Sequence, residues 1–249
     1  MYKMIISDLD GTLLRSDETV SKESIDFINN LEIPFAVATG RILGDVKKFL
    51  AGAKFKYVMA ANGSIIYDME EDKMIYEKCI SKENAEKYYN IVKDNAYKAY
   101  ASMIDDWLQI EEGQNFDELG NIYKMSAFFN TEEEYREIEE EILALGLKTF
   151  FMEDPYTDGY YMEVVETGSS KKAAIEYMLK DFGVELKDIV AFGDSKNDLE
   201  MLEAVGHGVA MKNASEDAKE IADDIASKTN DEDGVIAYIK EKLGEKLYV

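Results

Sequence analysis

The chain has 249 residues, 52 acidic and 28 basic, which gives a formal net charge of -24 and a pI of about 4.4. Such a surface repels polyanions and so argues against nucleic acid or an anionic membrane as a partner, although a small anionic substrate can still bind at a locally positive or metal-containing site. The single cysteine excludes an intrachain disulfide. No apolar segment is long enough for a signal peptide or a membrane span, so we expect a cytoplasmic protein.

The first third of the sequence alternates short apolar strands with amphipathic helices. Ser21 is placed to cap the first of these helices, and Gly52 to close the second. Strands are expected at 4–8, 34–39, 56–63 and 64–68, and helices at 21–31 and 40–52. This alternation predicts an α/β fold with a Rossmann-like parallel sheet that is covered by helices on both faces.

Residues 82–165 have a different character, with longer strands that are rich in tyrosine. Strands are expected at 100–110, 121–129, 148–154 and 159–165, and helices at 81–95 and 131–146. This pattern predicts an inserted α+β cap domain, a mostly antiparallel sheet with helices on one face. The glutamate run 132–141 is interpreted as the solvated face of a helix rather than as a metal site, because an apolar stripe accompanies it: Tyr135, Ile138, Ile142 and Leu145.

The last third returns to the pattern of the first. Strands are expected at 188–194 and 207–211, and helices at 169–183, 197–206, 215–222 and 233–243. Residues 1–81 and 166–249 are therefore predicted to form one catalytic core that the cap domain interrupts.

Two acidic strand ends carry most of the functional signal. Asp8 and Asp10 follow the first buried strand, and side chains two residues apart in a strand point the same way if the extended geometry persists. Asp194 follows a later strand, with Asp198 in the turn after it. The carboxyl ends of parallel strands share one sheet edge, where ligands bind. Several carboxylates there repel one another unless a cation joins them, and oxygen ligands with waters favour Mg²⁺.

Cationic and hydroxyl-bearing segments complete this predicted site. Lys171 and Lys172 open a helix, where a positive charge opposes the helix dipole, so an anion is expected nearby. Thr39, Gly40 and Arg41 lie where a strand gives way to a helix, and the backbone N–H groups and hydroxyl there are suited to phosphate. Together these features predict phosphoryl transfer, in which one aspartate attacks phosphorus and the other moves protons.

The segments DLDGTLL, ATGR, SSKKAA and FGDSKND occur in the order and approximate spacing of the haloacid dehalogenase superfamily. The chain most resembles its Cof-type hydrolases, phosphatases with a large cap between the second and third motifs, and the resemblance covers nearly the whole chain. It departs from the pattern in one place, because Lys172 stands where family members usually have glycine. Lys172 is therefore a minor rival to Lys171 as the motif lysine.

The resemblance implies a role for each motif residue. Asp8 would be the nucleophile and Asp10 the general acid/base, with Thr39 on the phosphoryl group and Lys171 neutralising charge. The resemblance also implies a Mg²⁺ site, whose ligands would be Asp8, Asp194 and the backbone carbonyl of Asp10, with Asp198 bound directly or through water. For the substrate, it implies that Asn197 orients phosphate or Lys171, and that Asn62 and Arg41 line the site.

The favoured hypothesis is a Mg²⁺-dependent phosphatase that acts on a small phosphorylated metabolite through an aspartyl-phosphate. Two alternatives stay open: a phosphomutase, and a non-catalytic phosphate-binding regulator on the same fold. The cap is expected to select the leaving group, with Trp107, Tyr156 and Asp158 as candidate residues, although core packing or turn formation is the favoured interpretation of Trp107. The sequence does not name the substrate or the oligomeric state.

Overall fold

The computed structural model describes residues 1–50, 52–154, 157–180 and 183–244. Within them the chain divides into two compact units. Unit 1 comprises Met1–Arg41, Asp45–Tyr76 and Ser170–Val249, and unit 2 comprises Ile42–Gly44 and Glu77–Ser169. The predicted domain boundaries, 82–165 for the cap and the rest for the core, stay a prediction. Of the candidate specificity residues, Tyr156 lies outside the described residues.

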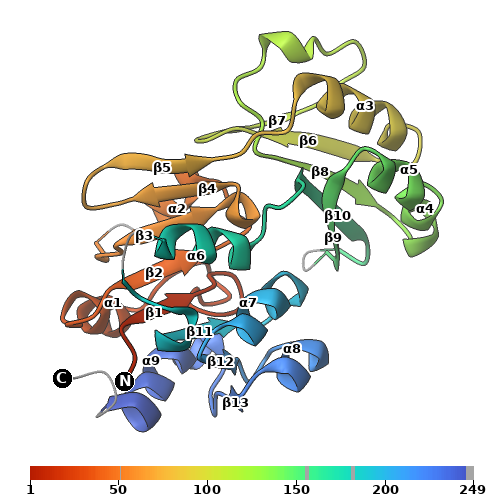
Figure 1. Ribbon diagram of the computed structural model, residues 1–249. Helices are drawn as coiled ribbons and strands as arrows, with labels where there is room; N and C mark the ends of the chain where they lie inside the picture. The colour runs from red at the N-terminus through yellow and green to blue at the C-terminus, as the bar shows by residue number, and fades with distance from the viewer. Residues whose placement is uncertain (51, 155–156, 181–182, 245–249) are drawn as a thin grey trace. The chain divides into compact units, whose positions relative to one another are not determined.

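Unit 1 is built on an eight-stranded sheet with the order β13-β12-β11-β1-β2-β3-β4-β5 (Figure 1). Neighbouring strands from β13 through β3 pair in parallel, as predicted. The strands are β1 Met4–Ser7, β2 Phe35–Ala38, β3 Tyr57–Ala60, β4 Ile65–Asp68, β5 Lys73–Glu77, β11 Ile189–Gly193, β12 His207–Ala210 and β13 Asp224–Ile225. β4 runs antiparallel to β3 because the connection at 61–64 is too short for a parallel crossover.

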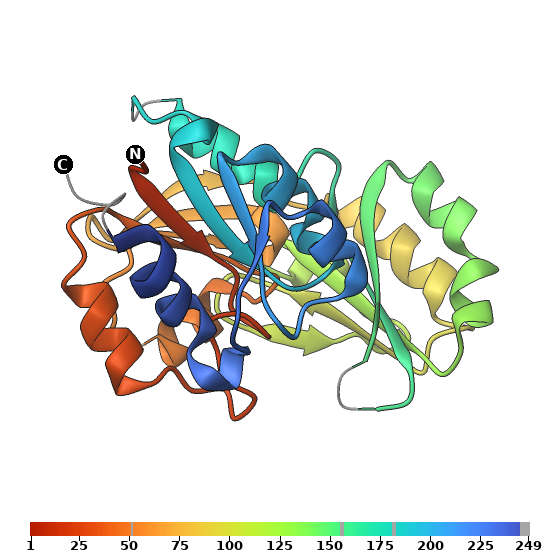
Figure 2. The same cartoon turned by 90° about the horizontal axis from the view of Figure 1, so that it is seen from below.

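Helices cover both faces of this sheet, as Figure 2 shows. The helices are α1 Lys22–Asn29, α2 Leu43–Phe49, α6 Lys171–Leu179, α7 Leu199–Ala204, α8 Glu216–Ile221 and α9 Gly234–Tyr238. Ala191 belongs to the buried cluster with α6 and α7. The next residue, Phe192, points to the other face, where its ring meets Tyr238 of α9 with centroids 5.6 Å apart. The short helical turns are η1 Ala61–Gly63, η3 Leu186–Asp188, η4 Lys196–Asp198, η5 Asn230–Glu232 and η6 Ile239–Leu243.

Unit 2 is a five-stranded antiparallel sheet with the order β7-β6-β8-β10-β9. Its strands are β6 Lys98–Ser102, β7 Trp107–Gln109, β8 Lys124–Phe129, β9 Leu147–Glu153 and β10 Tyr160–Glu166. Its helices are α3 Lys82–Val92, α4 Glu132–Arg136 and α5 Glu139–Ala144, and η2 spans Phe116–Glu118. Alternate strand residues such as Met125, Ala127 and Met162 pack with helix residues such as Tyr88 and Ile142 in one core. The predicted α/β fold with a second antiparallel sheet is confirmed.

The structure bears on four local predictions in unit 2. The buried stripe of the glutamate-rich segment is confirmed for Tyr135, Ile138 and Ile142. The expected single helix is instead two, α4 and α5, and like charges four residues apart disfavour a continuous helix there. The expected strand 100–110 is also two, because the chain turns at 103–106 to form the β6–β7 hairpin. Trp107 lies 56% exposed on β7, directly after that turn, so of its two favoured interpretations core packing is wrong.

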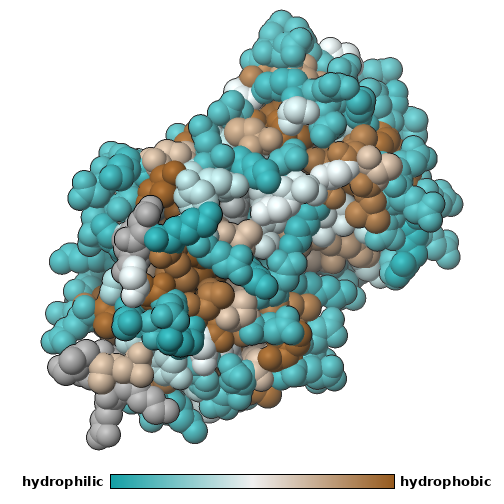
Figure 3. Space-filling model, viewed as in Figure 1, coloured by the Kyte–Doolittle hydropathy of each residue, from teal (hydrophilic) through white to brown (hydrophobic). Residues whose placement is uncertain are grey.

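The hydrophilic surface agrees with the high content of charged residues in the sequence. The face in Figure 3 is covered mostly by hydrophilic residues, with smaller hydrophobic patches between them. Among the helices of the described residues, none is long and apolar enough to cross a membrane.

Gly208 tests how tightly the sheet of unit 1 packs on its helices. A Cβ atom added at Gly208 would lie 2.2 Å from the Leu202 carbonyl oxygen of α7, and backbone cannot yield easily. Gly208→Ala is therefore expected to lower the free energy of unfolding by about 2–4 kcal/mol, measured by urea denaturation. Gly244→Ala is the matched control, because nothing lies within 4 Å of its added Cβ. Equal stability of the two variants would contradict the described packing.

Candidate active site

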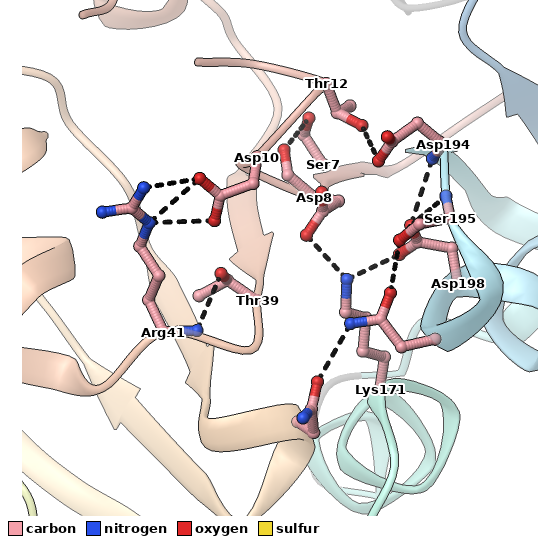
Figure 4. A network of polar contacts seen from close by, with 12 residues as sticks. Ser7, Asp8, Asp10, Thr12, Thr39, Arg41, Lys171, Asp194, Ser195 and Asp198 are labelled. Carbon is pink, nitrogen blue, oxygen red and sulfur yellow. Dashed lines mark hydrogen bonds and ion pairs between the residues drawn. The ribbon is translucent and has the colours of Figure 1, made fainter. Parts of the chain in front are cut away.

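The candidate site lies at the carboxyl ends of neighbouring strands of unit 1. Asp194 follows β11, Asp8 follows β1, and Thr39 follows β2, and these strands are adjacent in the sheet. Parallel pairing brings their carboxyl ends to one edge, where the following side chains converge, as Figure 4 shows. The backbone N–H of Asp8 still donates to the Phe192 carbonyl of β11 at 2.9 Å, which fixes the first turn after β1.

Lys171 joins two of the site's carboxylates. Its Nζ donates to Asp8 Oδ1 and to Asp198 Oδ1, both at 2.6 Å, and its side chain has no exposed surface. Lys171 is the first residue of α6, which Ser170 caps through a hydrogen bond from the Ala173 N–H. The expected anion near this unusual N-terminal lysine is therefore the protein's own pair of carboxylates. Lys172, by contrast, has a side chain that is 42% exposed and lies 4.0 Å from Glu176.

The turn after β11 holds Asp198 in place. Its Oδ2 accepts hydrogen bonds from the backbone N–H groups of Asp194 and Ser195, each at 3.1 Å, while its Oδ1 faces Lys171. Asp198 is fully buried, and each of its two carboxylate oxygens accepts a hydrogen bond. This bonding suits an orienting role, because the residue fixes both the lysine and the turn that carries Asp194.

Asp194 packs against the turn that follows β1. Its Oδ1 accepts a hydrogen bond from Thr12 Oγ1 at 3.2 Å. A Cβ atom added at Gly11 would lie only 2.3 Å from Asp194 Oδ2, and Gly11 has a φ of +74°. Both the approach and the left-handed backbone therefore require glycine at this position.

Three of the carboxylates form a group that fits a metal ion. Each of Asp8, Asp194 and Asp198 offers an oxygen, and these oxygens lie within 4.8 Å of one another. An all-oxygen donor set of this size fits a hard divalent cation such as Mg²⁺, which keeps several waters when protein-bound. The donor chemistry therefore agrees with the predicted metal site.

The electrostatics of this group also favour a cation. Burial raises the pKa of Asp194 to about 7, the Asp198 carboxylate adds to the rise, and Lys171 opposes it. Burial likewise raises the pKa of Asp8 above its ordinary value, against the effect of Lys171. Burial alone would lower the pKa of Lys171, but Asp198 and Asp8 outweigh it and raise that pKa. Three carboxylates share one ammonium, so a further positive charge stabilises their ionised forms.

Asp10 points away from this group. β1 ends at Ser7, so the extended geometry that would align Asp10 with Asp8 does not persist, and that premise is wrong. The Asp10 carboxylate instead accepts from Arg41 Nε at 2.8 and 3.1 Å and from Arg41 Nη2 at 2.6 Å (Figure 4). Arg41 Nη2 also donates to Glu18 at 2.8 Å.

The segment after β2 is not the start of a helix. Thr39, Gly40 and Arg41 connect β2 to α2, as expected, but α2 begins at Leu43 and not at Gly40, so these residues do not form its first turn. The backbone turns instead, and the Arg41 N–H donates to Thr39 Oγ1 at 3.1 Å. Thr39 is buried, and its hydroxyl retains its own proton for donation to a ligand oxygen.

The connection η1 links the remaining site residues. Ala61, Asn62 and Gly63 all have positive φ, and Asn62 Oδ1 accepts from Asn197 Nδ2 at 3.1 Å. The Ala61 and Asn62 N–H groups donate to the carbonyls of Arg41 and Thr39. A Cβ atom on Gly63 would lie 2.2 Å from the Ser170 carbonyl, next to Lys171. One left-handed turn thus connects the segments that carry Thr39, Asn197 and Lys171.

The sequence reasoning missed three residues of this network. Thr12 bonds Asp194, Ser195 bonds Asn197 and Asp198 through its hydroxyl, and Glu18 bonds Arg41. Thr12 and Ser195 lie inside the two acidic motifs, so a search for hydroxyl groups in those turns would have found them. Nothing in the sequence around Glu18 distinguishes it from other surface glutamates.

Comparison with known proteins identifies the family. The model of the haloacid dehalogenase-like hydrolases matches residues 5–119 and 108–239. The chain belongs to this haloacid dehalogenase-like hydrolase family. The predictions of a Cof-type hydrolase and of a phosphatase as the enzyme class are confirmed.

Relatives cover the chain almost completely. Phosphatase YwpJ of Bacillus subtilis is 30% identical over 97% of this chain and 100% of its own length. HMP-PP phosphatase of Serratia proteamaculans is 28% identical over 86% of this chain and 85% of its own. Among solved structures, a haloacid dehalogenase-like hydrolase from B. subtilis superposes with a TM-score of 0.84 at 27% identity, covering 97% of this chain and 100% of that one.

Replacing Lys171 by methionine is expected to remove activity and to destabilise the fold, because two buried carboxylates lose their shared ammonium. Hydrolysis of an aryl phosphate should fall by about a thousandfold or more. Lys172→Met is the matched control and should retain activity within about twofold, since the partly exposed Lys172 side chain has its ion pair with Glu176 and not with the clustered carboxylates. Thermal unfolding checks that the Lys171 variant is folded at the assay temperature. Greater loss in the Lys172 variant would reverse the assignment of the motif lysine.

Replacing Asp194 by asparagine is expected to stabilise the metal-free protein near neutral pH. The pKa of about 7 in the folded state lies above the ordinary 3.8, so folding binds a proton between these values and stability falls as pH rises through them. The Asp194→Asn variant lacks this decline with pH, which amounts to about 1–3 kcal/mol in the free energy of unfolding.

Thermal unfolding of both proteins in EDTA, from pH about 4 to about 8, measures this difference. Added Mg²⁺ should raise the unfolding temperature of the wild type and not of the variant. Asp94→Asn, which removes an exposed carboxylate in unit 2, controls for net charge. Parallel pH profiles for wild type and the Asp194 variant would contradict the prediction.

Proposed function

We propose that the protein is a Mg²⁺-dependent phosphatase that hydrolyses a small phosphorylated metabolite through an aspartyl-phosphate. One observation carries the proposal. The Asp8 carboxylate is buried, lies 2.6 Å from the Lys171 ammonium, and shares a cation-sized group with Asp194 and Asp198. A carboxylate held in this way is directed at an incoming electrophile, and its surroundings offset the negative charge of a phosphoryl group.

In the first step, an Asp8 oxygen bonds to phosphorus while the bond from phosphorus to the leaving oxygen breaks. Lys171 fixes the orientation of the Asp8 carboxylate and offsets the negative charge on the oxygens of the phosphoryl group during transfer. Asp10 gives a proton to the leaving oxygen. In the second step, Asp10 takes a proton from a water molecule, which attacks phosphorus and releases Asp8 and inorganic phosphate.

The phosphoryl group is bound by the segment after β2 and by the Asn62–Asn197 pair. The Thr39 hydroxyl accepts from the Arg41 N–H and can therefore donate its proton to a phosphoryl oxygen. Gly40 contributes backbone, and Arg41 adds a positive charge at the site. The hydrogen bond between Asn62 and Asn197 keeps both amides directed at the same region.

Asp8, Asp194 and the backbone carbonyl of Asp10 would hold Mg²⁺, with Asp198 supporting it directly or through water. When bound, the ion supplies the positive charge that this acidic pocket and a phosphate dianion both require. The protein's own part is to fix the carboxylates, which Thr12 does for Asp194, and which the backbone N–H groups of the turn do for Asp198.

The substrate class is drawn from the chemistry of relatives. Proteins from B. subtilis that are 28% and 29% identical are named 5-amino-6-(5-phospho-D-ribitylamino)uracil phosphatases. A Methanothermobacter thermautotrophicus protein that is 27% identical is named phosphoglycolate phosphatase. These names share a small phosphate monoester, so we propose a sugar phosphate or similar metabolite of the cytoplasm. The net charge of -24 disfavours a nucleic acid substrate.

Asp8→Asn is expected to abolish turnover while preserving the fold, because the amide cannot attack phosphorus. Hydrolysis of p-nitrophenyl phosphate with and without Mg²⁺ measures this, and the loss should exceed about a thousandfold. Asp217→Asn, an exposed aspartate of the same unit, is the control. Wild-type activity in the Asp8 variant, or full activity in EDTA, would end the proposed mechanism. A panel of phosphorylated metabolites, scored by phosphate release, then identifies the substrate.

A further inference from the structure

The Asp10 side chain forms a bidentate contact with Arg41 that directs it away from Asp8. Arg41 Nε and Nη2 both donate to its carboxylate, and the closest contact is 2.6 Å (Figure 4). Planar pairing of this kind fixes direction as well as distance. The Asp8 carboxylate meanwhile faces Lys171. The conformation therefore separates the two aspartates that the proposed reaction requires to act on one substrate.

Arg41 is the more buried partner in this contact and Asp10 the more exposed one. The Arg41 side chain is 18% exposed, against 53% for Asp10. The Arg41 guanidinium also lies 4.3 Å from the centre of the Phe49 ring, which restrains its plane. The Asp10 side chain therefore has more room to rotate than the Arg41 side chain.

Glu18 is a second carboxylate on the same guanidinium nitrogen. Arg41 Nη2 donates to Glu18 Oε1 at 2.8 Å. Glu18 has a φ of +61°, a left-handed conformation that is costly for a glutamate. The loop that carries it is fastened at both sides of this residue, since the Arg15 N–H donates to the Thr19 carbonyl at 2.9 Å.

The same loop is tied to the turn before α9. Arg15 forms an ion pair with Asp233 at 2.6 Å, and Ser16 donates from its backbone and its hydroxyl to Asp231, both at 2.8 Å. Glu18 is thus presented to Arg41 by a loop that is attached to this turn at two residues, Arg15 and Ser16. An incidental surface ion pair does not need this support.

We propose that Glu18 is a positioning residue that sets how readily Asp10 leaves Arg41. When Asp10 turns toward the reacting oxygen, Glu18 keeps the Arg41 charge paired with a carboxylate. When the Glu18 carboxylate is removed, Asp10 is the carboxylate that remains of the two described on Arg41. Arg41 then holds Asp10 more tightly in the direction that points away from Asp8. This role rests on the proposed function, because it requires Asp10 to act on the leaving group.

Glu18→Gln tests the role, because it keeps the shape of the side chain and removes the charge. We expect kcat to fall by about tenfold with KM unchanged within about twofold, since the released conformation is rarer while ground-state binding is the same. The unfolding temperature should not change, because the ion pair is exposed on the Glu18 side at 46%. Glu32→Gln, another exposed glutamate of unit 1, is the matched control.

Arg41→Ala provides the background that separates positioning from structure. It removes the hold on Asp10, so adding Glu18→Gln to it should leave kcat at saturating substrate unchanged. An unchanged kcat in the single Glu18 variant, or an equal fractional loss when Glu18→Gln is added to Arg41→Ala, would each overturn the proposal. If Asp8→Asn is inactive and one of these results is found, the positioning role alone fails. An active Asp8→Asn variant contradicts the phosphatase mechanism itself.

Discussion

The buried contact of Lys171 with Asp8 and Asp198 is the constraint on which the rest of the site depends. An ammonium without exposed surface is stable only when carboxylates surround it closely, and these two do so at 2.6 Å. The contact ties the end of β1, the start of α6 and the turn after β11 to one point. Each of these segments then carries its neighbouring polar groups to the same sheet edge, Thr12 and Asp194 among them.

Tight backbone packing keeps this point in register. Gly63 lets the left-handed turn η1 approach the Ser170 carbonyl, and Gly11 lets the first acidic motif approach Asp194. A side chain at Gly11 would push apart segments that Lys171 joins, and a side chain at Gly63 would push η1 away from the start of α6. The geometry of the site therefore depends on glycines that take no part in the chemistry, and on a connection with three consecutive residues of positive φ.

The sequence predicted the parallel sheet, the second antiparallel sheet and the meeting of Asp8, Asp194 and Asp198, because strand order and motif position follow from local patterns. It did not predict the direction of Asp10, since that depends on where β1 ends and on Arg41, which lies 31 residues away. The predictions of where α2 starts and of whether Trp107 is buried differed from the structure for a related reason. Local periodicity does not distinguish a turn from a helix start, or a hairpin edge from a core strand.

The charge of the whole chain bears on how such a site can bind phosphate. A protein with a net charge of -24 opposes the approach of any dianion, and its candidate site adds three clustered carboxylates to that opposition. Lys171 is already paired twice and Arg41 is shared by two carboxylates, so neither presents a full unpaired charge. A cation bound among these carboxylates would add to the charge that Lys171 and Arg41 can offer a phosphate dianion. The electrostatics of the chain therefore support the proposed Mg²⁺ dependence, as does the chemistry of phosphoryl transfer.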